Sequence, residues 1–600
     1  MSKPLLKFHP DKSIAVLPFV NMSADPGNEY FSDGITEEII NALTTVEGLK
    51  VVARTSSFAF KNKNVDVRTI GRQLGVSSIL EGSVRKSNNR VRVTAQLIST
   101  QDGTHFWSKN FDRELEDIFA LQDEVSLLIA DQIRENFGHL TIQNHLVEAP
   151  TQNISAYTLY LKGRYHHLMW DGPGITNAIE HYEQCVAIEP TFALPYFGLG
   201  YSYAMQGSWG QDKRSLMLAE ENLNKGFDLD QQSHMGYFSR ATLQFWGRWD
   251  FIHGHQLFQK ALELNPAYTE AEEGLCELYT AIGYFEIAHQ HIDHSLSINP
   301  LSPNHHFTKA NIYYLSKDFV RAVECLETSL KITPTFTHSI ALLQLCYIHL
   351  NEYEKLDHLL NQNPLAERPE ECRVLYRLVH PTDPIDDDLS RVRLMVKEDI
   401  GTTLFPWQLF LLAQSGEHQI ALDLLEGNIK IRRGQIINFM NIPLLEPLHQ
   451  YQRFQDLLRS VFDKALLPPE PTKRIQIEKP KALMSAAESK IVLKNLSKEM
   501  QEGKWFQDTS LSLRKLADKL NISSNKLSWL LNEKMGKNFN DYINSLRLES
   551  FKAKALDPRN SHLTLLGLAY DSGFNSKSVF NTFFKKMEGM SPRAWVKKQL

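Results

Sequence analysis

Three six-residue stretches repeat in the middle of the chain: Ala261-Leu-Glu-Leu-Asn-Pro266, Ser295-Leu-Ser-Ile-Asn-Pro300 and Ser329-Leu-Lys-Ile-Thr-Pro334. Each ends on a proline, and the consecutive prolines at 266, 300 and 334 lie 34 residues apart. Because proline cannot continue the hydrogen-bond ladder of a helix, each one marks a helix end. The spacing therefore predicts a helical repeat of 34 residues.

A period of 34 residues is typical of tetratricopeptide repeats, in which two antiparallel helices form each repeat and stacked repeats bury a continuous core. An earlier copy, Cys185-Val-Ala-Ile-Glu-Pro190, is out of step with the others, so we expect an inserted or degenerate repeat between them. Helical patterns continue to about residue 462. We predict an all-α solenoid of tetratricopeptide type over residues 155–466, with a concave surface for a protein or peptide partner.

The composition is that of a soluble multidomain chain. Its 600 residues suggest roughly four domain-sized units, and 42% hydrophobic with 22% charged residues exclude wholesale disorder. Apolar stretches are too short for a membrane span, and residues 13–20 are too short for a signal peptide. The five cysteines are far apart and form no CxxC pair, which argues against a zinc ribbon or a disulfide framework. We expect a cytoplasmic protein that contacts no membrane.

The charge is distributed unevenly along the chain. Residues 482–600 contain 20 Lys and Arg against 11 Asp and Glu, a balance of +9, so the net −5 of the whole chain leaves −14 for residues 1–481. The sign changes at Leu467-Pro-Pro-Glu-Pro-Thr-Lys-Arg-Ile-Gln-Ile-Glu-Lys-Pro480, a stretch whose prolines favour an extended, semi-rigid linker. We predict a linker over 467–481 and a basic domain after it, as expected when one end of a chain meets nucleic acid.

The basic domain begins with a helix-turn-helix pattern, Leu511-Ser-Leu-Arg-Lys-Leu-Ala-Asp-Lys-Leu-Asn-Ile-Ser-Ser-Asn-Lys-Leu-Ser-Trp-Leu-Leu531. Ala517 is small enough to let two helices approach where they cross. Asn521 tolerates the left-handed backbone that ends a helix, and Ser523 is a good cap for the next one. This segment predicts a second helix of a size that enters a DNA major groove.

A second segment has the same form: Leu563-Thr-Leu-Leu-Gly-Leu-Ala-Tyr-Asp-Ser-Gly-Phe-Asn-Ser-Lys-Ser-Val-Phe-Asn-Thr-Phe-Phe584. Here Ala569, Gly573 and Ser576 take the three roles at the crossing, the turn and the cap. A long helix over residues 539–555 is expected to join the two units. Two such matches are much more specific than one.

The same segment resembles the AraC family of bacterial transcription regulators. The resemblance rests on Gly573-Phe-Asn-Ser-Lys-Ser-Val-Phe-Asn-Thr-Phe-Phe-Lys585, Gly589-Met-Ser-Pro-Arg-Ala-Trp595 and Gly536-Lys-Asn-Phe-Asn-Asp-Tyr-Ile-Asn-Ser-Leu-Arg547. It implies an all-α AraC-type domain with two helix-turn-helix units over residues 482–600, with a core at 508–598. It also implies sequence-specific binding of double-stranded DNA, with both recognition helices in successive major-groove segments.

Residues on the outer face of each expected recognition helix are the candidates for DNA contact, by helix geometry and in agreement with the family's pattern. The base-facing candidates are Ser524, Asn525, Ser528, Trp529, Lys577, Ser578, Asn581 and Thr582. The phosphate candidates are Lys526, Lys585, Lys586 and Arg593.

Side-chain chemistry assigns some of these contacts. Asn525 and Asn581 are suited to adenine edges, and Lys577 to guanine or phosphate. Trp529 stands where many family members have a longer polar residue, so we expect apolar contact with thymine methyls or a sugar. The alternative for each single candidate is a solvated surface side chain.

The N-terminal part predicts an α/β domain over residues 13–138. Ala15-Val-Leu-Pro-Phe-Val-Asn-Met-Ser-Ala-Asp-Pro26, Tyr30-Phe-Ser-Asp-Gly-Ile-Thr-Glu37, Leu80-Glu-Gly-Ser-Val-Arg85 and Phe111-Asp-Arg-Glu-Leu-Glu-Asp-Ile-Phe-Ala-Leu-Gln-Asp-Glu124 resemble the TolB amino-terminal-like module. In bacterial regulators this module precedes tetratricopeptide repeats, and in some chains it follows a class III nucleotide cyclase domain. The resemblance implies no catalytic role.

Two clusters of polar residues are candidates for a carboxylate site and a metal site. Asp25, Asp33, Glu37 and Glu38 are close enough for a carboxylate site, although acids that complement the dipole of a first helical turn explain them better. The stretch His289-Gln-His-Ile-Asp-His294 is better explained as the surface of a repeat helix, because its spacing does not place all three histidines on one face. No phosphate-binding glycine loop is present. We expect no metal, no cofactor and no enzyme activity.

The leading hypothesis is a cytoplasmic transcription regulator whose repeats and N-terminal domain receive a protein or peptide signal. The alternative is a repeat scaffold for protein assembly, with DNA contact secondary. An enzyme using the N-terminal domain is the third possibility and lacks a nucleophile–base pair. No coiled-coil heptads decide between a monomer and a dimer.

Overall fold

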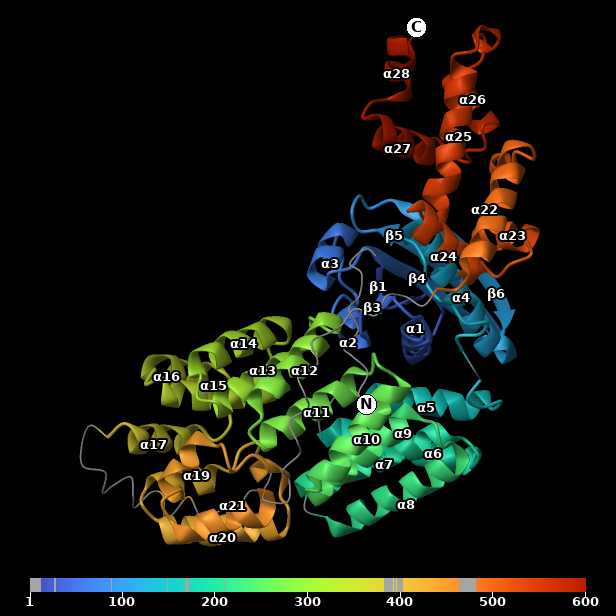
Figure 1. The fold of residues 1–600 in the computed structure, drawn as a ribbon. Coiled ribbons are helices and arrows are strands. Elements are labelled where there is room, and N and C mark those ends of the chain that lie inside the picture. The colour runs from blue at the N-terminus through green and yellow to red at the C-terminus, as the bar shows by residue number, and fades with distance from the viewer. Residues whose placement is uncertain are drawn as a thin grey trace.

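The computed structural model describes residues 12–599 except 26–27, 88, 148, 168–171, 211, 382–391, 393–394, 396–402 and 463–481. The expected linker at 467–481 lies outside the described residues. Three parts follow one another along the chain, and the N-terminal sheet domain (blue) lies between the helical solenoid and the C-terminal helices (red) (Figure 1). The expected fold class is confirmed: an α/β part, an all-α repeat part and an all-α C-terminal part.

The N-terminal domain is built on a six-stranded mixed sheet, with strand order β3-β1-β4-β5-β6 and β2 paired to β4. Strand β1 pairs in parallel with β3 and β4, whereas β4, β5 and β6 form an antiparallel meander. The alternation of buried and exposed residues along β5 matches this half-buried position. The strands are β1 (Ser13–Val16), β2 (Val20–Asn21), β3 (Lys50–Val51), β4 (Ser78–Ser87), β5 (Arg90–Ser99) and β6 (His105–Glu114).

Helices cover both faces of this sheet. On one face, α1 (Glu29–Thr44) and α4 (Ile118–Phe137) bury Ile39 and Ile129 against the strands. On the other face, Ile70 and Leu74 of α3 (Val67–Leu74) belong to a smaller apolar cluster, and the short α2 (Arg54–Phe58) lies in the chain between two of its other members, Val52 and Phe60. The first cluster continues into the helices that follow α4, so the sheet domain and the first repeats share one core.

The central part consists of helices packed pairwise along the chain. They are α5 (Ile154–His167), α6 (Gly172–Ile188), α7 (Ala193–Gly210), α8 (Lys213–Leu229), α9 (His234–Thr242), α10 (Phe251–Leu264), α11 (Thr269–Ala281), α12 (Phe285–Ile298), α13 (Pro303–Leu315), α14 (Phe319–Ile332), α15 (Thr337–His349), α16 (Tyr353–Gln362), α17 (Pro369–Val379), α19 (Trp407–Gln414), α20 (His418–Lys430) and α21 (Gln452–Phe462).

The 34-residue period is visible in the backbone itself. Helices α10, α12 and α14 end at 264, 298 and 332, each two residues before one of the repeated prolines. The tight turn inside each repeat places one residue in the left-handed region, and these residues also recur every 34 positions: Trp249, Gly283, Lys317 and Asn351. One backbone geometry is therefore repeated, and the side chain at the turn position varies.

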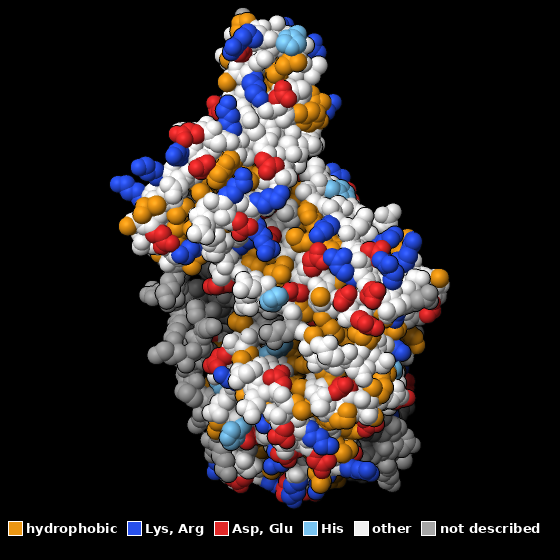
Figure 2. Space-filling model, turned by 90° about the vertical axis from the view of Figure 1, so that its right-hand side faces the viewer, with side chains coloured by type: hydrophobic (Ala, Val, Ile, Leu, Met, Phe, Trp, Pro, Cys, Tyr) orange, Lys and Arg blue, Asp and Glu red, His pale blue; other side chains and the backbone are white. Residues whose placement is uncertain are grey.

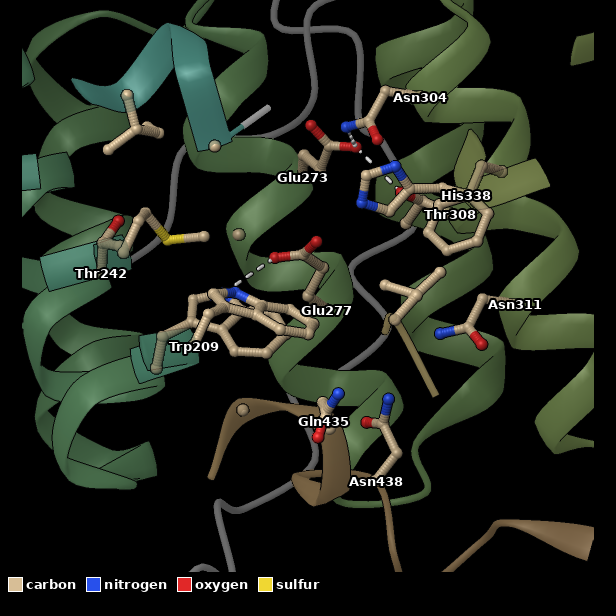
Figure 3. Close-up of a pocket in the computed structure, with 18 of the residues that line it drawn as sticks. Trp209, Thr242, Glu273, Glu277, Asn304, Thr308, Asn311, His338, Gln435 and Asn438 are labelled. Atoms are coloured by element: carbon tan, nitrogen blue, oxygen red, sulfur yellow. Dashed lines mark hydrogen bonds between the residues drawn. The ribbon is translucent and has the colours of Figure 1, made fainter. Parts of the chain in front are cut away.

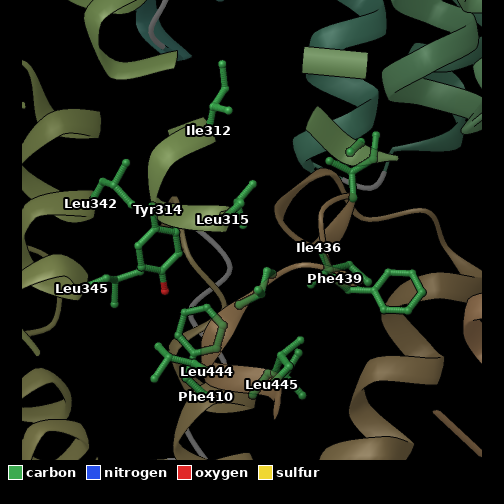
Figure 4. Packing of buried hydrophobic residues seen from close by; sticks show 14 of the residues in the cluster. Ile312, Tyr314, Leu315, Leu342, Leu345, Phe410, Ile436, Phe439, Leu444 and Leu445 are labelled. Carbon is green, nitrogen blue, oxygen red and sulfur yellow. The ribbon is translucent and has the colours of Figure 1, made fainter. Parts of the chain in front are cut away.

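The solenoid folds back on itself after α17. Leu444 and Leu445, from the single turn at Pro443–Leu448, pack with Phe410 of α19 and with residues of α13 and α15 (Figure 4). Lys317 forms an ion pair with Glu446 across the same boundary. The later helices thus close one side of the repeat array.

The C-terminal part is all-α. Its helices are α22 (Ala486–Gln501), α23 (Leu513–Lys519), α24 (Ser524–Met535), α25 (Phe539–Ala555), α26 (Leu565–Asp571), α27 (Lys577–Glu588) and α28 (Pro592–Gln599). The pairs α23–α24 and α26–α27 form two helix-turn-helix units, each with its own small core. Among all described residues, no helix is long and apolar enough to cross a membrane.

Candidate nucleic-acid interface

The second helix-turn-helix unit presents its recognition helix to solvent. Gly573 takes the left-handed turn (φ 101°), and the Ser576 hydroxyl caps α27 by accepting from the Val579 backbone N–H at 3.1 Å. Phe580, Phe583 and Phe584 are buried in the core. All four base-facing candidates of this helix are exposed: Lys577, Ser578, Asn581 and Thr582.

The phosphate candidates near this unit are also exposed. Lys585 lies at the last turn of α27, and Arg593 lies on α28. Lys586 reaches across to α25, where its ammonium donates to Asp541 at 3.0 Å. In the face drawn in Figure 2, Lys and Arg side chains are spread over the narrow upper part, which the C-terminal helices form. The arrangement leaves a polar helix face, with cations beside it, open to a DNA groove.

The first unit has the same local geometry. Asn521 takes the left-handed turn (φ 55°), and the Ser523 hydroxyl accepts from the Lys526 backbone N–H at 3.3 Å. These caps and turns are the ones that the sequence predicts. The two units differ in what covers their recognition helices.

Asn525, the base-facing candidate at the start of α24, is bound to the N-terminal domain. Its Oδ1 accepts from the Arg134 guanidinium at 2.6 Å and from the Ile142 backbone N–H at 3.3 Å. Its Nδ2 donates to the Ile142 carbonyl at 3.1 Å. The Oδ1 acceptor and one Nδ2 donor, the pair of groups that would read a base edge, are thus both engaged by protein.

Further contacts hold the same two domains together at the end of α4. The Glu135 carboxylate accepts from the Leu513 backbone N–H, at the start of α23, at 2.8 Å. The Asn136 carbonyl accepts from Asn538 at 2.8 Å, and the Asn136 side-chain oxygen accepts from Asn540 at 2.9 Å. In this arrangement the first recognition helix is covered by the N-terminal domain.

The close approach continues at Gly138, which ends α4 with φ 109°. A Cβ at this position would lie 2.6 Å from Oδ1 of Asn532 on α24. A side chain here would have to displace the Asn532 amide, and the positive φ would strain any other residue, so this position favours glycine.

The other candidates on α24 differ from their predicted exposure. Ser528 is 3% exposed and Trp529 is 5% exposed. Trp529 packs with Met484 and Val492, because α22 lies over that face of α24. Lys526 forms an ion pair with Glu488 of α22 at 2.8 Å. Ser524 is half-buried. Helix geometry alone predicts that this face of α24 is exposed, whereas α22 packs against it.

Burial changes the titration of the charged groups at the end of α4. Burial raises the pKa of Glu135 to about 7, and the nearby Asp131 carboxylate adds to the rise. The hydrogen bond from the Leu513 N–H acts in the opposite direction and lowers this pKa. Burial also raises the pKa of Asp131, which Arg134 and Arg514 oppose. The interface therefore contains a carboxyl group that titrates near neutral pH.

Some members of the two polar clusters, Asp33, Glu37 and His291, have partners inside the protein. Asp33 binds Lys61 at 2.7 Å, and Glu37 binds Arg164 at 3.1 Å. His291 bonds to Glu272 of the neighbouring helix at 2.5 Å. No group of three or more His, Cys, Asp or Glu side chains in the described part of the chain could hold a metal ion.

The contacts of Arg134, Glu135 and Asn136 with the C-terminal helices were not predicted. These residues lie about 380–400 positions before their partners, and their own helix reads as an ordinary amphipathic helix. A polar run at the end of a helix carries no signal of its partner, so the sequence alone could not reveal this interface.

Two family models match this chain. Residues 516–598 match a helix-turn-helix domain, which confirms the two-unit domain expected at the C-terminus. Residues 10–128 match the second domain of HilA/YgeH-like transcriptional regulators. The N-terminal match is to a module of regulators, while the TolB amino-terminal-like resemblance stays a prediction.

Similar proteins include a "Putative adenylate cyclase 3" of Rhizobium meliloti (strain 1021), which is 38% identical over 241 residues, 39% of this chain and 40% of that protein. The Schizosaccharomyces pombe protein "Anaphase-promoting complex subunit 3" is 23% identical over 22% of this chain and 20% of its own length. This chain thus spans two fifths or less of the curated relatives it matches.

Solved structures are similar at low identity. Human IFIT1 with m7Gppp-AAAA is 15% identical, with a TM-score of 0.35 over 56% of this chain and 77% of that chain. YrrB, a tetratricopeptide protein with an unusual peptide-binding site, is 17% identical, with a TM-score of 0.21 over 32% of this chain and 96% of its own. At such scores neither structure supports an argument about function.

Proposed function

We propose that this protein is a sequence-specific DNA-binding transcription regulator and that its N-terminal domain covers the first of its two recognition helices. The observation that carries this proposal is the contrast between the two units. The polar face of α27 is open, whereas Asn525 on α24 is bound to Arg134 and Ile142. Full engagement of DNA by both units then requires the contact between α4 and α24 to open.

We propose a separate role for each of the three domains. We place the domains at 13–138, 155–466 and 482–600, with the linker at 467–481. The match of residues 10–128 to a transcription-regulator module supports a regulatory role for the N-terminal domain. The repeats are proposed to receive a protein or peptide signal, and the protein is proposed to act in the cytoplasm without enzyme activity.

The test begins with genomic fragments selected by the full-length chain, followed by fluorescence anisotropy on the selected site at several salt concentrations. We expect Asn581→Ala to weaken binding to the selected site and to relax its sequence preference, because a bidentate side-chain contact to a base carries about 1–3 kcal/mol of discrimination. The matched control is Lys213→Ala, an exposed cation on α8 of the solenoid.

Two results would count against the proposal. One is the absence of any enriched sequence among the selected fragments. The other is equal DNA affinity for the wild type and for a double variant, Lys577→Ala with Asn581→Ala, while both remain folded by circular dichroism. Either result would favour a scaffold in which DNA contact is secondary.

A further inference from the structure

The solenoid lines a cavity of about 690 Å³, partly open to solvent, that the function proposed above does not use. Helices α7 and α9 form one wall, and α11 runs across the middle. Residues 403–405 and 434–438, from the part of the chain that folds back, close the far side. Figure 3 shows Glu273 and Glu277 pointing into this space, opposite Gln435 and Asn438. The volume is in the range of cavities that hold small organic ligands.

The charge of the cavity lining has one sign. Helix α11 contributes Glu270, Glu273 and Glu277, spaced to lie on one helical face, and Glu367 adds a fourth carboxylate. The described lining residues include no Lys or Arg. Arg164 lies 3.9 Å from Glu270 and is bound to Glu37, and the His305 ring lies 3.6 Å from Glu273. An anionic ligand would therefore be repelled.

The remaining lining is rich in aromatic rings. Trp209 lies with its ring centroid 5.9 Å from that of Trp246, and the Trp246 indole N–H donates to Glu277 at 3.2 Å. Tyr201 stacks on Phe238 at 5.4 Å. Aromatic faces attract cations through the ring quadrupole, and the attraction grows when the cation leaves water. Aromatic walls around carboxylates of which Glu273 is buried and Glu277 half-buried form the type of site that selects an organic cation.

The two central carboxylates differ in their partners. Asn304 and Thr308 donate to Glu273 at 2.8 and 2.9 Å, which holds this side chain in place. Glu277 accepts from Trp246, and burial beside Glu273 raises the pKa of Glu277 to about 8. In the described part of the chain, neither forms an ion pair with Lys or Arg. A bound cation would favour the ionised form of Glu277 and pair with it.

We propose that this cavity binds a protonated amine or a guanidinium group, with Glu273 and Glu277 as its counter-ions and Trp209 and Trp246 as its aromatic walls. The cation is either a free small amine or the basic side chain of a peptide. A bare metal ion fits poorly, because the described carboxylates of the cavity are not grouped so that three or more could hold one ion.

The test uses calorimetry on the whole chain with three probes. Two are cations, 1,6-diaminohexane and an acetylated, amidated Gly-Arg-Gly peptide. The third, 1,6-hexanediol, matches the diamine in length and is uncharged. We expect the diamine or the peptide to bind and the diol not to bind. Diamine binding assigns the site to free amines. Binding of the peptide alone assigns it to basic side chains.

Variants then locate the site. Glu277→Gln keeps an acceptor for the Trp246 N–H and removes the charge, so we expect at least tenfold weaker binding with an unchanged melting temperature of the free protein. Trp209→Ala removes an aromatic wall and is expected to weaken binding as well. Glu327→Gln, an exposed glutamate on α14, is the matched control and should leave binding unchanged.

A proton readout separates this site from an unspecific acidic surface. Because a cation favours the ionised form of Glu277, diamine binding should release a proton and strengthen as the pH rises from 7 to 9. The other titratable or charged groups facing the pair include Tyr201, Glu270, Cys276, His305, His338, Glu367 and Arg164. Equal binding of diol and diamine, binding of none of the three probes, or unchanged binding by Glu277→Gln would overturn the proposal.

Discussion

Replacing Glu135 by Gln should remove a pH dependence from DNA binding without opening the contact between the domains. Glu135 is 7% exposed and accepts from the Leu513 N–H at 2.8 Å. Burial raises the pKa of this carboxyl from an ordinary 4.5 to about 7. A glutamine keeps a side-chain oxygen for the Leu513 N–H, so the variant changes the titration and retains the hydrogen bond.

The direction of the pH dependence follows from where the proton on Glu135 binds more tightly. The closed arrangement binds a proton on Glu135 more tightly than an open, solvated arrangement does, so closure is favoured at low pH and weakens as the pH rises through about 7. The difference between the two pKa values corresponds to about 3 kcal/mol over the full titration. Between pH 6 and pH 8 it changes the closing equilibrium about tenfold. DNA affinity of the full-length chain should therefore increase by about that factor over this range.

Fluorescence anisotropy on the selected DNA site, at constant ionic strength, measures this increase. The charged groups near Glu135, namely Asp131 and Arg134 with Arg514 beside Asp131, are the same in both proteins, so the comparison isolates the titration of Glu135. The Glu135→Gln variant should show a flat profile once the slope common to both proteins is subtracted. The reasoning is refuted if the variant keeps the wild-type pH dependence.

Three further predictions concern other parts of the chain. Asn136→Ala removes the acceptor of Asn540 and should raise DNA affinity several-fold, since one such hydrogen bond contributes about 1 kcal/mol; unchanged affinity would show that the contact does not limit binding. Lys577→Ala should reduce the slope of log affinity against log salt by about 1 if this lysine contacts a phosphate, and an unchanged slope would assign it elsewhere. Gly274→Ala places a Cβ 2.4 Å from the Phe258 ring and should lower the stability of the repeats by about 1–3 kcal/mol in urea unfolding; a stability equal to the wild type would show that Phe258 moves aside.

Local features of the sequence are sufficient to predict where these helices begin and end. The prolines at 266, 300 and 334 each follow a helix end, because proline cannot continue the hydrogen-bond ladder of the preceding helix. Ser523, Ser576 and Gly573 cap or turn the chain through their own side chains and backbone. Each of these effects acts over a few residues, so it can be recognised without knowing the rest of the fold.

Whether the candidate DNA-contacting residues are exposed or buried depends on contacts that the sequence does not show. The exposed face of α27 agrees with the helix geometry assumed from the sequence, and base contact by its residues stays a prediction. On α24, the same geometry was assumed, but α22 buries Trp529 and the N-terminal domain binds Asn525. Both partners come from outside the helix-turn-helix pattern.

The sequence by itself determined the repeat period, the two helix-turn-helix units and the segregation of basic charge at the C-terminus, because these depend on local backbone preferences and composition. Only the tertiary structure decided which recognition helix is covered and where the acidic cavity lies. Asn525 meets a residue 391 positions earlier, and the cavity brings α11 against residues 434–438. Such contacts depend on how whole domains pack, and the side chains involved are ordinary polar residues in sequence.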